Sequence, residues 1–260
     1  MITSANNGQI KNVVQLQQKT KARRDQGLFV VEGMKMFREA PVDWVYKVYV
    51  SNRLETDGEI QERLEEFQAE IVEDRVFRQM SDTKTPQGIL CVLKKPQYKL
   101  ERLLEKENPL LVVLEDLQDP GNVGTILRTA EGAGVDGILM SRNTVDLFNP
   151  KVIRSTMGSI YRMPFVTVEN MDEAIKCLKS RGIMTCAAHL QGRNVYDEES
   201  YLGGTAFLIG NEGNGLSQHL TEQADCLIRI PMAGQVESLN AAMAAGILMY
   251  EAGRQRRKRV

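Results

Sequence analysis

The second half of the chain alternates short apolar segments with segments long enough to hold a helix. Residues 110–114, Leu-Leu-Val-Val-Leu, are apolar throughout, which is typical of a strand covered on both faces. Because about ten or more residues separate consecutive strands, the connections favour a mostly parallel sheet, whose ligands bind at the carboxyl ends of the strands. Further strands are predicted at 137–140, 164–168, 183–188, 206–209 and 226–230, and helices at 123–131, 152–161, 171–179, 216–223 and 239–254.

The 260-residue chain is long for one domain, and its first part predicts a separate, smaller α/β domain. The lone Trp44 is expected in the core of this domain, and a helix broken by Gly27 is expected ahead of its first strand. We predict a first domain at 1–95, a linker at 96–109 and a second domain at 110–260. The strands predicted in the first domain are 28–31, 44–50, 71–72 and 88–93.

The net charge of −1 argues against a basic field over the whole surface, but the charges are unevenly distributed. Acidic residues gather in 59–73 and 101–107, whereas basic residues crowd the two ends of the chain. This distribution fits either a local phosphate-binding patch or only a solvated helix end and a frayed tail. The basic residues are Lys11, Lys19, Lys21, Arg23 and Arg24 at one end, and Arg254, Arg256, Arg257, Lys258 and Arg259 at the other.

The sequence disfavours membrane, secreted and metal-dependent proteins. No apolar stretch approaches the roughly 18 to 20 residues of a membrane span, and the first residues do not resemble a signal peptide, so a cytoplasmic protein is expected. The four cysteines form no CxxC pair and are expected to be reduced core thiols. His189 and His219 are the only histidines, so no histidine-rich cluster is available and no metal is expected.

Gly132, Gly134 and Gly137 match the G-x-G-x-x-G pattern of dinucleotide-binding proteins. That pattern must follow a strand and open a helix, whereas these glycines follow a predicted helix and precede a predicted strand. We therefore expect them to end the helix, and a nicotinamide-dependent oxidoreductase loses its main support.

The first predicted strand of the second domain leads into an unusual loop and helix at residues 119–130. Asn122 is placed to cap this helix, and Arg128 lies near its start. Arg128 is either a surface arginine or, because its helix should pack on the sheet, a residue placed to clamp a phosphate at a cleft.

Two later strands end in loops that also point to a ligand. In residues 208–217, three glycines let the backbone approach a ligand, and Glu212 occupies the strand tip, where an unpaired carboxylate is costly. In residues 230–240, Ser238 is placed to cap a long helix that is rich in small residues. Such a helix face packs closely against another backbone, of this chain or of a partner.

Together, the three loops resemble the signature motifs of the SpoU (or TrmH-like) branch of the SPOUT RNA 2′-O-ribose methyltransferases. The resemblance extends over about residues 110–253, most of the second domain. The first domain is similar, less specifically, to the small α/β/α L30e-like substrate-binding domain that often precedes it. The motif order, the spacing and five residues carry the resemblance: Asn122, Arg128, Glu212, Ser238 and Asn240.

The resemblance implies an α/β fold with a deep trefoil knot in the second domain, and a homodimer with active sites near the subunit interface. It also implies that S-adenosylmethionine is bound in a bent shape, mainly by backbone groups. By position, the cofactor-binding residues are Leu208, Gly210, Asn211, Ile230, Met232, Ser238 and Leu239. RNA is expected to contact Lys11, Lys19, Lys21, Arg23 and Arg24.

The implied reaction transfers a methyl group in line to a ribose hydroxyl, which must lose its proton during attack, and it needs no metal. Arg128 is expected to fix an RNA phosphate and to stabilise the developing alkoxide, since arginine is essentially always protonated. Asn122, Ser238 and Asn240 are expected to orient the ribose and Arg128. Glu212 is expected to hold the loop geometry or to pair with an arginine, which could lie across the dimer.

Two stretches depart from the family pattern. Ala241 and Ala242 follow Asn240 where relatives carry a valine and a serine, so a hydroxyl is missing, and residues 131–134 replace a more apolar stretch. The L30e-like domain favours 23S rRNA as the substrate, with a tRNA ribose as the alternative, while the first motif disfavours methylation of a base. A non-catalytic RNA-binding protein on the same fold is the remaining alternative.

Overall fold

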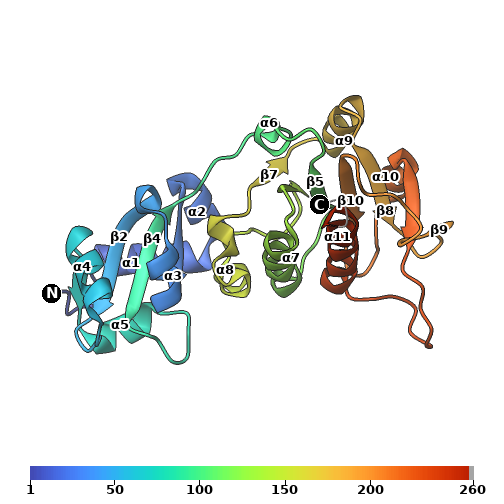
Figure 1. Ribbon diagram of the computed structural model, residues 1–260. Helices are drawn as coiled ribbons and strands as arrows, with labels where there is room; N and C mark the ends of the chain where they lie inside the picture. Colours follow the sequence, from blue (N-terminus) through green and yellow to red (C-terminus); the bar gives the residue numbers. More distant parts are fainter. Residues whose placement is uncertain (258–260) are drawn as a thin grey trace. The chain divides into compact units, whose positions relative to one another are not determined.

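The computed structural model describes residues 1–257, and these form two compact units (Figure 1). Unit 1 consists of Met1–Pro96 together with Asp146–Tyr161. Unit 2 consists of Gln97–Val145 together with the described residues from Arg162 onward. The segment Asp146–Tyr161, which the sequence analysis placed in the second domain, therefore packs within unit 1. The assignment of separate RNA-binding and catalytic domains stays a prediction.

Unit 1 is a four-stranded sheet with helices on both faces. Its strand order is β1-β4-β2-β3, in which β4 pairs antiparallel with β1 and β2, and β2 pairs parallel with β3. Strand β4 is buried on both faces of the sheet, which explains its unbroken apolar run. The strands are β1 (Leu28–Glu32), β2 (Val45–Ser51), β3 (Glu70–Val72) and β4 (Ile89–Lys94), and the helices are α1 (Gly8–Gln18), α2 (Thr20–Gln26), α3 (Met34–Glu39), α4 (Gly58–Glu66), α5 (Asp74–Met80) and α8 (Pro150–Thr156), with short 3-10 turns at Val42–Trp44 and Ser159–Tyr161.

The predicted strands of unit 1 are confirmed, with two local differences. The basic N-terminal helix is split into α1 and α2, because Lys19 adopts an extended conformation between them. Trp44 is only partly buried, and its ring packs edge-on against that of Tyr161, with 5.9 Å between the ring centroids.

Unit 2 is a seven-stranded sheet in which every strand pair is parallel, as predicted. Its strand order is β7-β6-β5-β10-β8-β11-β9. The two-residue β9 is too short to be recognised from its sequence. The strands are β5 (Leu110–Leu114), β6 (Gly137–Ser141), β7 (Phe165–Val168), β8 (Met184–Ala188), β9 (Asn194–Val195), β10 (Thr205–Ile209) and β11 (Cys226–Arg229), and the helices are α6 (Leu100–Leu103), α7 (Pro120–Ala133), α9 (Met171–Ser180), α10 (Gln218–Gln223) and α11 (Ala241–Arg257).

The helices of unit 2 cover the two faces of the sheet. Apolar side chains of α9 and α10 pack with alternate residues of β5 and β10 in one core cluster. Helices α7 and α11 lie side by side (Figure 1). Their contact is close because α11 presents glycine to α7: a Cβ on Gly246 would lie 3.5 Å from Thr129 Cγ2, and one on Gly253 would lie 3.4 Å from the carbonyl oxygen of Ala133. Gly246 and Gly253 of α11 therefore pack against a helix of this same chain.

Of the three glycines that match the dinucleotide pattern, Gly134 has the helix-ending role that was predicted, whereas Gly132 lies inside α7. Gly134 ends α7 in the left-handed conformation, with φ 77°. Gly137 begins β6 at a point where a Cβ would lie 2.3 Å from Leu103 Cγ, so a side chain there would displace Leu103.

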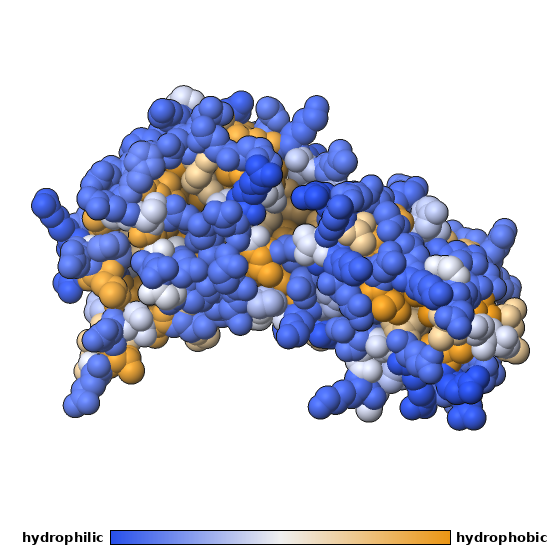
Figure 2. All heavy atoms as spheres, turned by 180° about the vertical axis from the view of Figure 1, so that it is seen from behind, coloured by the Kyte–Doolittle hydropathy of each residue, from blue (hydrophilic) through white to orange (hydrophobic). Residues whose placement is uncertain are grey.

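On the face shown in Figure 2, hydrophilic side chains predominate and hydrophobic ones appear between them in scattered groups. Within residues 1–257, the structure contains no helix that is both long and apolar enough to cross a membrane.

Candidate active site

A cavity of about 720 Å³ lies in unit 2 at the carboxyl ends of β8, β10 and β11. Six of the predicted cofactor-binding residues line it: Gly210, Asn211, Ile230, Met232, Ser238 and Leu239. Leu208 does not, because its side chain is fully buried among the apolar residues between the sheet and α9 and α10. Leu208 was predicted to hold the cofactor through its backbone, and that assignment stays a prediction.

The loop after β8 is a part of the cavity wall that the sequence analysis missed. Ala188, His189, Leu190 and Gln191 all line the cavity. No unusual composition marks these residues. The rule that ligands sit at the carboxyl ends of parallel strands could nonetheless have found them, because β8 lies next to both β10 and β11.

The loop after β10 is folded tightly onto itself. The backbones of Asn211 and Gly215 exchange two hydrogen bonds, of 3.0 and 2.8 Å. A Cβ on Gly210 would lie 2.1 Å from the carbonyl carbon of Gly215, so only glycine fits at this position. This part of the cavity wall therefore contains bare backbone.

Glu212 joins this loop to the loop after β5. Its carboxylate accepts hydrogen bonds from the backbone N–H groups of Gln118 and Asp119 at 3.1 and 3.0 Å, and from Asn122 Nδ2 at 3.0 Å. Burial alone would raise the pKa of Glu212, but the hydrogen bonds from Asn122 and from the backbone outweigh this effect and lower it. Glu212 is therefore ionised at neutral pH and holds the loop geometry, and no arginine among the described residues pairs with it.

Asn240 extends the network to the loop after β11. Its Nδ2 donates to Asn122 Oδ1 at 2.8 Å, and its Oδ1 accepts from the backbone N–H groups of Ala242 and Met243 at 2.9 and 3.3 Å. Asn240 therefore caps α11, and the prediction of Ser238 as the cap was wrong, because the helix begins at Ala241. Glu212, Asn122 and Asn240 form one hydrogen-bonded network, called here the Glu212 network.

The prediction that Asn122 caps the next helix, α7, was also wrong. The helix begins at Pro120, and the Asp119 side chain accepts a hydrogen bond from the backbone N–H of Asn122 at 2.8 Å. Asp119 is thus the cap, and the side chain of Asn122 is free to join Glu212 and Asn240.

Arg128 lies on the exposed surface of α7. It is six residues, or about 9 Å along the helix axis, from Asn122. Within the part of the chain that the structure describes, its guanidinium has no hydrogen-bond or ion-pair partner. The helix does pack on the sheet, but Arg128 is not on the packed side, so it is available to a group from outside the chain. Ser238 is likewise exposed at the cavity.

The predicted RNA-contacting residues of unit 1 divide into two kinds. Lys11, Lys19, Lys21 and Arg24 are exposed on α1 and α2 or between them. Arg23 is only 1% exposed, and predicting it as an RNA contact was wrong.

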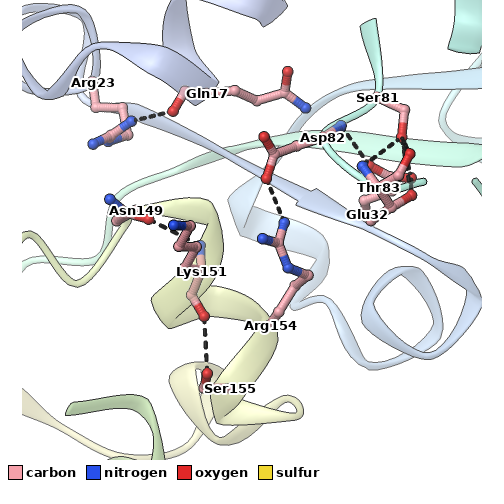
Figure 3. Close-up of polar contacts among 10 residues, drawn as sticks. All are labelled: Gln17, Arg23, Glu32, Ser81, Asp82, Thr83, Asn149, Lys151, Arg154 and Ser155. Atoms are coloured by element: carbon pink, nitrogen blue, oxygen red, sulfur yellow. Dashed lines mark hydrogen bonds and ion pairs between the residues drawn. The ribbon is translucent and has the colours of Figure 1, made fainter. Parts of the chain in front are cut away.

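Arg23 is buried because its guanidinium is fully used inside unit 1. Nη1 donates to the carbonyl oxygens of Leu16 and Gln17 at 2.7 and 2.9 Å, and Nε forms an ion pair with Asp146 at 2.7 Å. Figure 3 shows Arg23 turned toward Gln17. In the same view, Arg154 of α8 reaches Asp82, which is another of the contacts that bind the segment 146–161 to this unit.

The basic residues at the other end of the chain are partly occupied. Arg254 forms an ion pair with Glu251, and Arg256 donates to the backbone carbonyls of Tyr201 and Gly203. Lys258 and Arg259 lie outside the described residues. Among residues 1–257, no group of three or more metal-ligating side chains comes together.

Comparison with known proteins assigns both parts of the chain. The sequence pattern of the SpoU rRNA Methylase family matches residues 109–250, and that of the MRM3-like substrate binding domain matches residues 7–91. The 23S rRNA (guanosine(2553)-2′-O)-methyltransferase RlmP of Bacillus subtilis is 32% identical over 96% of this chain and 97% of its own. An uncharacterized tRNA/rRNA methyltransferase of Synechocystis is 34% identical over 98% of this chain and 93% of its own.

Solved structures agree with the sequence comparison. The SpoU methyltransferase AviRb from Streptomyces viridochromogenes, in complex with the cofactor AdoMet, has a TM-score of 0.88 at 28% identity and covers 96% of this chain and 98% of its own. The AdoMet-bound rRNA methyltransferase from Sinorhizobium meliloti has a TM-score of 0.86 at 29% identity, with 97% of each chain covered.

Proposed function

Because the chain belongs to the SpoU rRNA methylase family, we propose that it methylates a ribose 2′-hydroxyl of 23S rRNA. The chain is an RNA 2′-O-methyltransferase whose cofactor is S-adenosylmethionine. The choice of 23S rRNA is supported by RlmP, which is similar over nearly the full length of both chains. The observation that carries the proposal is the Glu212 network, which joins the loops after β5, β10 and β11 beside the cavity.

The cavity fits the cofactor in size and in lining. Pockets for ligands of this size measure roughly 300–1,000 Å³, and this one measures about 720 Å³. Gly210 supplies bare backbone, while Ile230, Met232 and Leu239 supply apolar contact. When bound there, S-adenosylmethionine supplies a methyl group on a positively charged sulfur, open to attack by an oxygen.

The Glu212 network leaves hydrogen-bond donors free for a substrate. Asn122 Nδ2 and Asn240 Nδ2 each carry two hydrogens and use one within the network. The remaining hydrogens can be donated to oxygens of the ribose, from positions that the ionised Glu212 holds fixed. Such positioning lowers the barrier because the reacting oxygen is already aligned with the methyl carbon.

We assign Arg128 to the RNA. Its exposed guanidinium, without a partner in the described chain, is suited to bind the phosphate next to the target ribose. The same charge stabilises the ribose oxygen as it loses its proton. The exposed hydroxyl of Ser238 at the cavity is assigned to orienting the ribose.

The substrate is tested by transfer of tritiated methyl groups from S-adenosylmethionine to rRNA and tRNA from cells that lack the protein. Label in 23S rRNA, recovered in an alkali-resistant dinucleotide, is expected, because a methylated 2′-oxygen cannot attack the adjacent phosphate. Label found only in tRNA would mean that the substrate is tRNA, while the type of reaction stays the same. Label recovered in single nucleotides after alkaline hydrolysis would mean that a base is methylated and would contradict the proposal.

We further propose that two copies of the chain form a homodimer through α11. Met243, Ile247 and Tyr250 recur at helical spacing, and Met243 and Tyr250 are 59% and 49% exposed. An apolar stripe of this kind is suited to burial against a second copy. Light scattering coupled to gel filtration is expected to give a mass of two chains for the wild-type protein. The Met243→Lys variant is expected to have a measured mass closer to that of one chain. A monomeric wild-type protein would contradict the proposal.

The free state of the cysteines supports a cytoplasmic location, which we also propose. Cys91, Cys177, Cys186 and Cys226 all occur as free thiols. Thiols of this kind are typical of a reducing compartment, which is also where ribosomal RNA is available in bacteria.

A further inference from the structure

The loop after β5 turns at Asp116, which has a backbone conformation unusual for a residue with a side chain. Its φ is 57°, in the left-handed region. Aspartate enters this region more readily than most residues, but at a cost that neighbouring contacts must offset. Asp116 does not line the cavity, and its carboxylate and carbonyl are both hydrogen-bonded to other groups of the chain, so we expect any effect on the reaction to act through those residues.

The side chain of Asp116 binds the end of β6. Its Oδ1 accepts a hydrogen bond from Ser141 Oγ at 2.6 Å, and its Oδ2 accepts one from Asn143 Nδ2 at 3.2 Å. The backbone N–H of Asp116 donates to the same Ser141 Oγ at 2.8 Å. Ser141 is thus held from two sides, and the loop after β5 is fixed to the loop after β6.

The carbonyl of Asp116 binds in the opposite direction, toward the loop after β10. It accepts hydrogen bonds from Asn211 Nδ2 at 2.8 Å and from Gln118 Nε2 at 3.2 Å. Asn211 directly precedes Glu212, and the backbone N–H of Gln118 donates to Glu212 Oε2. Each of the two residues that donate to this carbonyl is therefore connected directly to Glu212, by a peptide bond from Asn211 and by a hydrogen bond from Gln118.

We propose that Asp116 is a positioning residue for the Glu212 network. The left-handed turn aims the carbonyl at Asn211 while the carboxylate holds Ser141, so that Glu212, Asn122 and Asn240 are fixed relative to β6. This role rests on the proposed function for its effect on the reaction. The linkage between Asp116 and the loops is a property of the fold and can be tested without the reaction.

The decisive variant is Asp116→Gly, which keeps the positive φ without strain but removes the carboxylate. We expect kcat per S-adenosylmethionine-binding site to fall about 10- to 100-fold, as displaced catalytic groups do, with an unchanged KM for RNA. Asp116→Asn tolerates the same φ and keeps an oxygen for Ser141 Oγ, so it should recover most of the rate. Gln68→Gly is the matched control, because Gln68 also has a positive φ of 48° but lies in unit 1.

A second pair of measurements separates this role from general stability. Ser141→Ala should reproduce the loss of kcat, and the Asp116→Gly, Ser141→Ala double variant should be little worse than either single variant. Hydrogen exchange should increase in residues 117–122 and 211–217 of Asp116→Gly, and in neither segment of Gln68→Gly.

Two results would overturn the proposal. One is a wild-type rate for Asp116→Gly, or a rate that falls only with the fraction of protein able to bind S-adenosylmethionine. The other is unchanged exchange in both segments. If the wild-type protein itself transferred no methyl group, the proposed function would fail, and hydrogen exchange would still decide whether Asp116 holds the Glu212 network.

Discussion

Glu212 is an exposed carboxylate whose environment nevertheless controls its charge. Three hydrogen-bond donors, two of them backbone N–H groups, converge on it from the loop after β5 and the start of α7. A carboxylate with this many donors is held ionised, and its removal would leave those donors without their partner. At the scale of one residue, Glu212 is a structural centre, whereas the unpartnered Arg128 is available for the substrate.

Substitution of Glu212 should affect stability in a pH-dependent way. Its pKa is lowered from 4.5 in the folded protein, so its contribution to the free energy of unfolding is present above about pH 5 and is lost as the pH falls through the lowered value. Glu212→Gln should therefore be less stable than wild type at pH 7, with a difference that shrinks on acidification. Urea unfolding at several pH values measures it, and a pH-independent difference would count against the assignment.

Most elements of the fold could be predicted because burial imposes a pattern on the sequence. The five apolar residues of β5 and the four apolar residues that follow Thr205 in β10 are buried on both faces of the sheet, so both strands could be predicted from the sequence. The caps were misassigned for a local reason: Asp119 and Asn122, and likewise Ser238 and Asn240, are neighbouring residues that can all cap. Sequence alone does not decide which one the helix begins after.

Asn240 caps α11 and donates a hydrogen bond to Asn122, and substitutions can separate these two roles. Asn240→Ala removes the cap of α11 and should cost about 1 kcal/mol of stability as well as activity. Asn240→Asp keeps the capping oxygen but replaces the donor that Asn122 Oδ1 accepts from, so it should retain stability and lose activity. Thermal unfolding and methyl transfer, measured on both variants, test the distinction. Equal losses of stability would contradict it.

Over the whole chain, the burial of some residues could not be predicted from local sequence patterns, because it depends on contacts with residues far away in the sequence. Arg23 reads as one of five basic N-terminal residues, but Asp146, 123 positions away, forms an ion pair with it and buries it. The same long-range packing places residues 146–161 in unit 1. The trefoil knot, implied by the family resemblance, stays a prediction.

RNA binding should distinguish the exposed basic residues from Arg23. Lys21→Gln should weaken RNA binding and reduce the slope of log affinity against log salt by about 0.7 to 0.9, the value for one phosphate contact, without changing stability. Arg23→Gln should instead lower the free energy of unfolding, because it removes the ion pair with Asp146 and the hydrogen bonds to two backbone carbonyls. An unchanged salt dependence in Lys21→Gln would remove that residue from the RNA surface.

The most direct measurement is nucleoside mass spectrometry of 23S rRNA incubated with S-adenosylmethionine and either wild-type protein or Arg128→Ala. One additional 2′-O-methylated nucleoside is expected with the wild type, and its formation should fall by about 100-fold or more in the variant, which should bind the cofactor as tightly as before. An Arg128→Ala protein that methylates at the wild-type rate, or a product methylated on the base, would contradict the account.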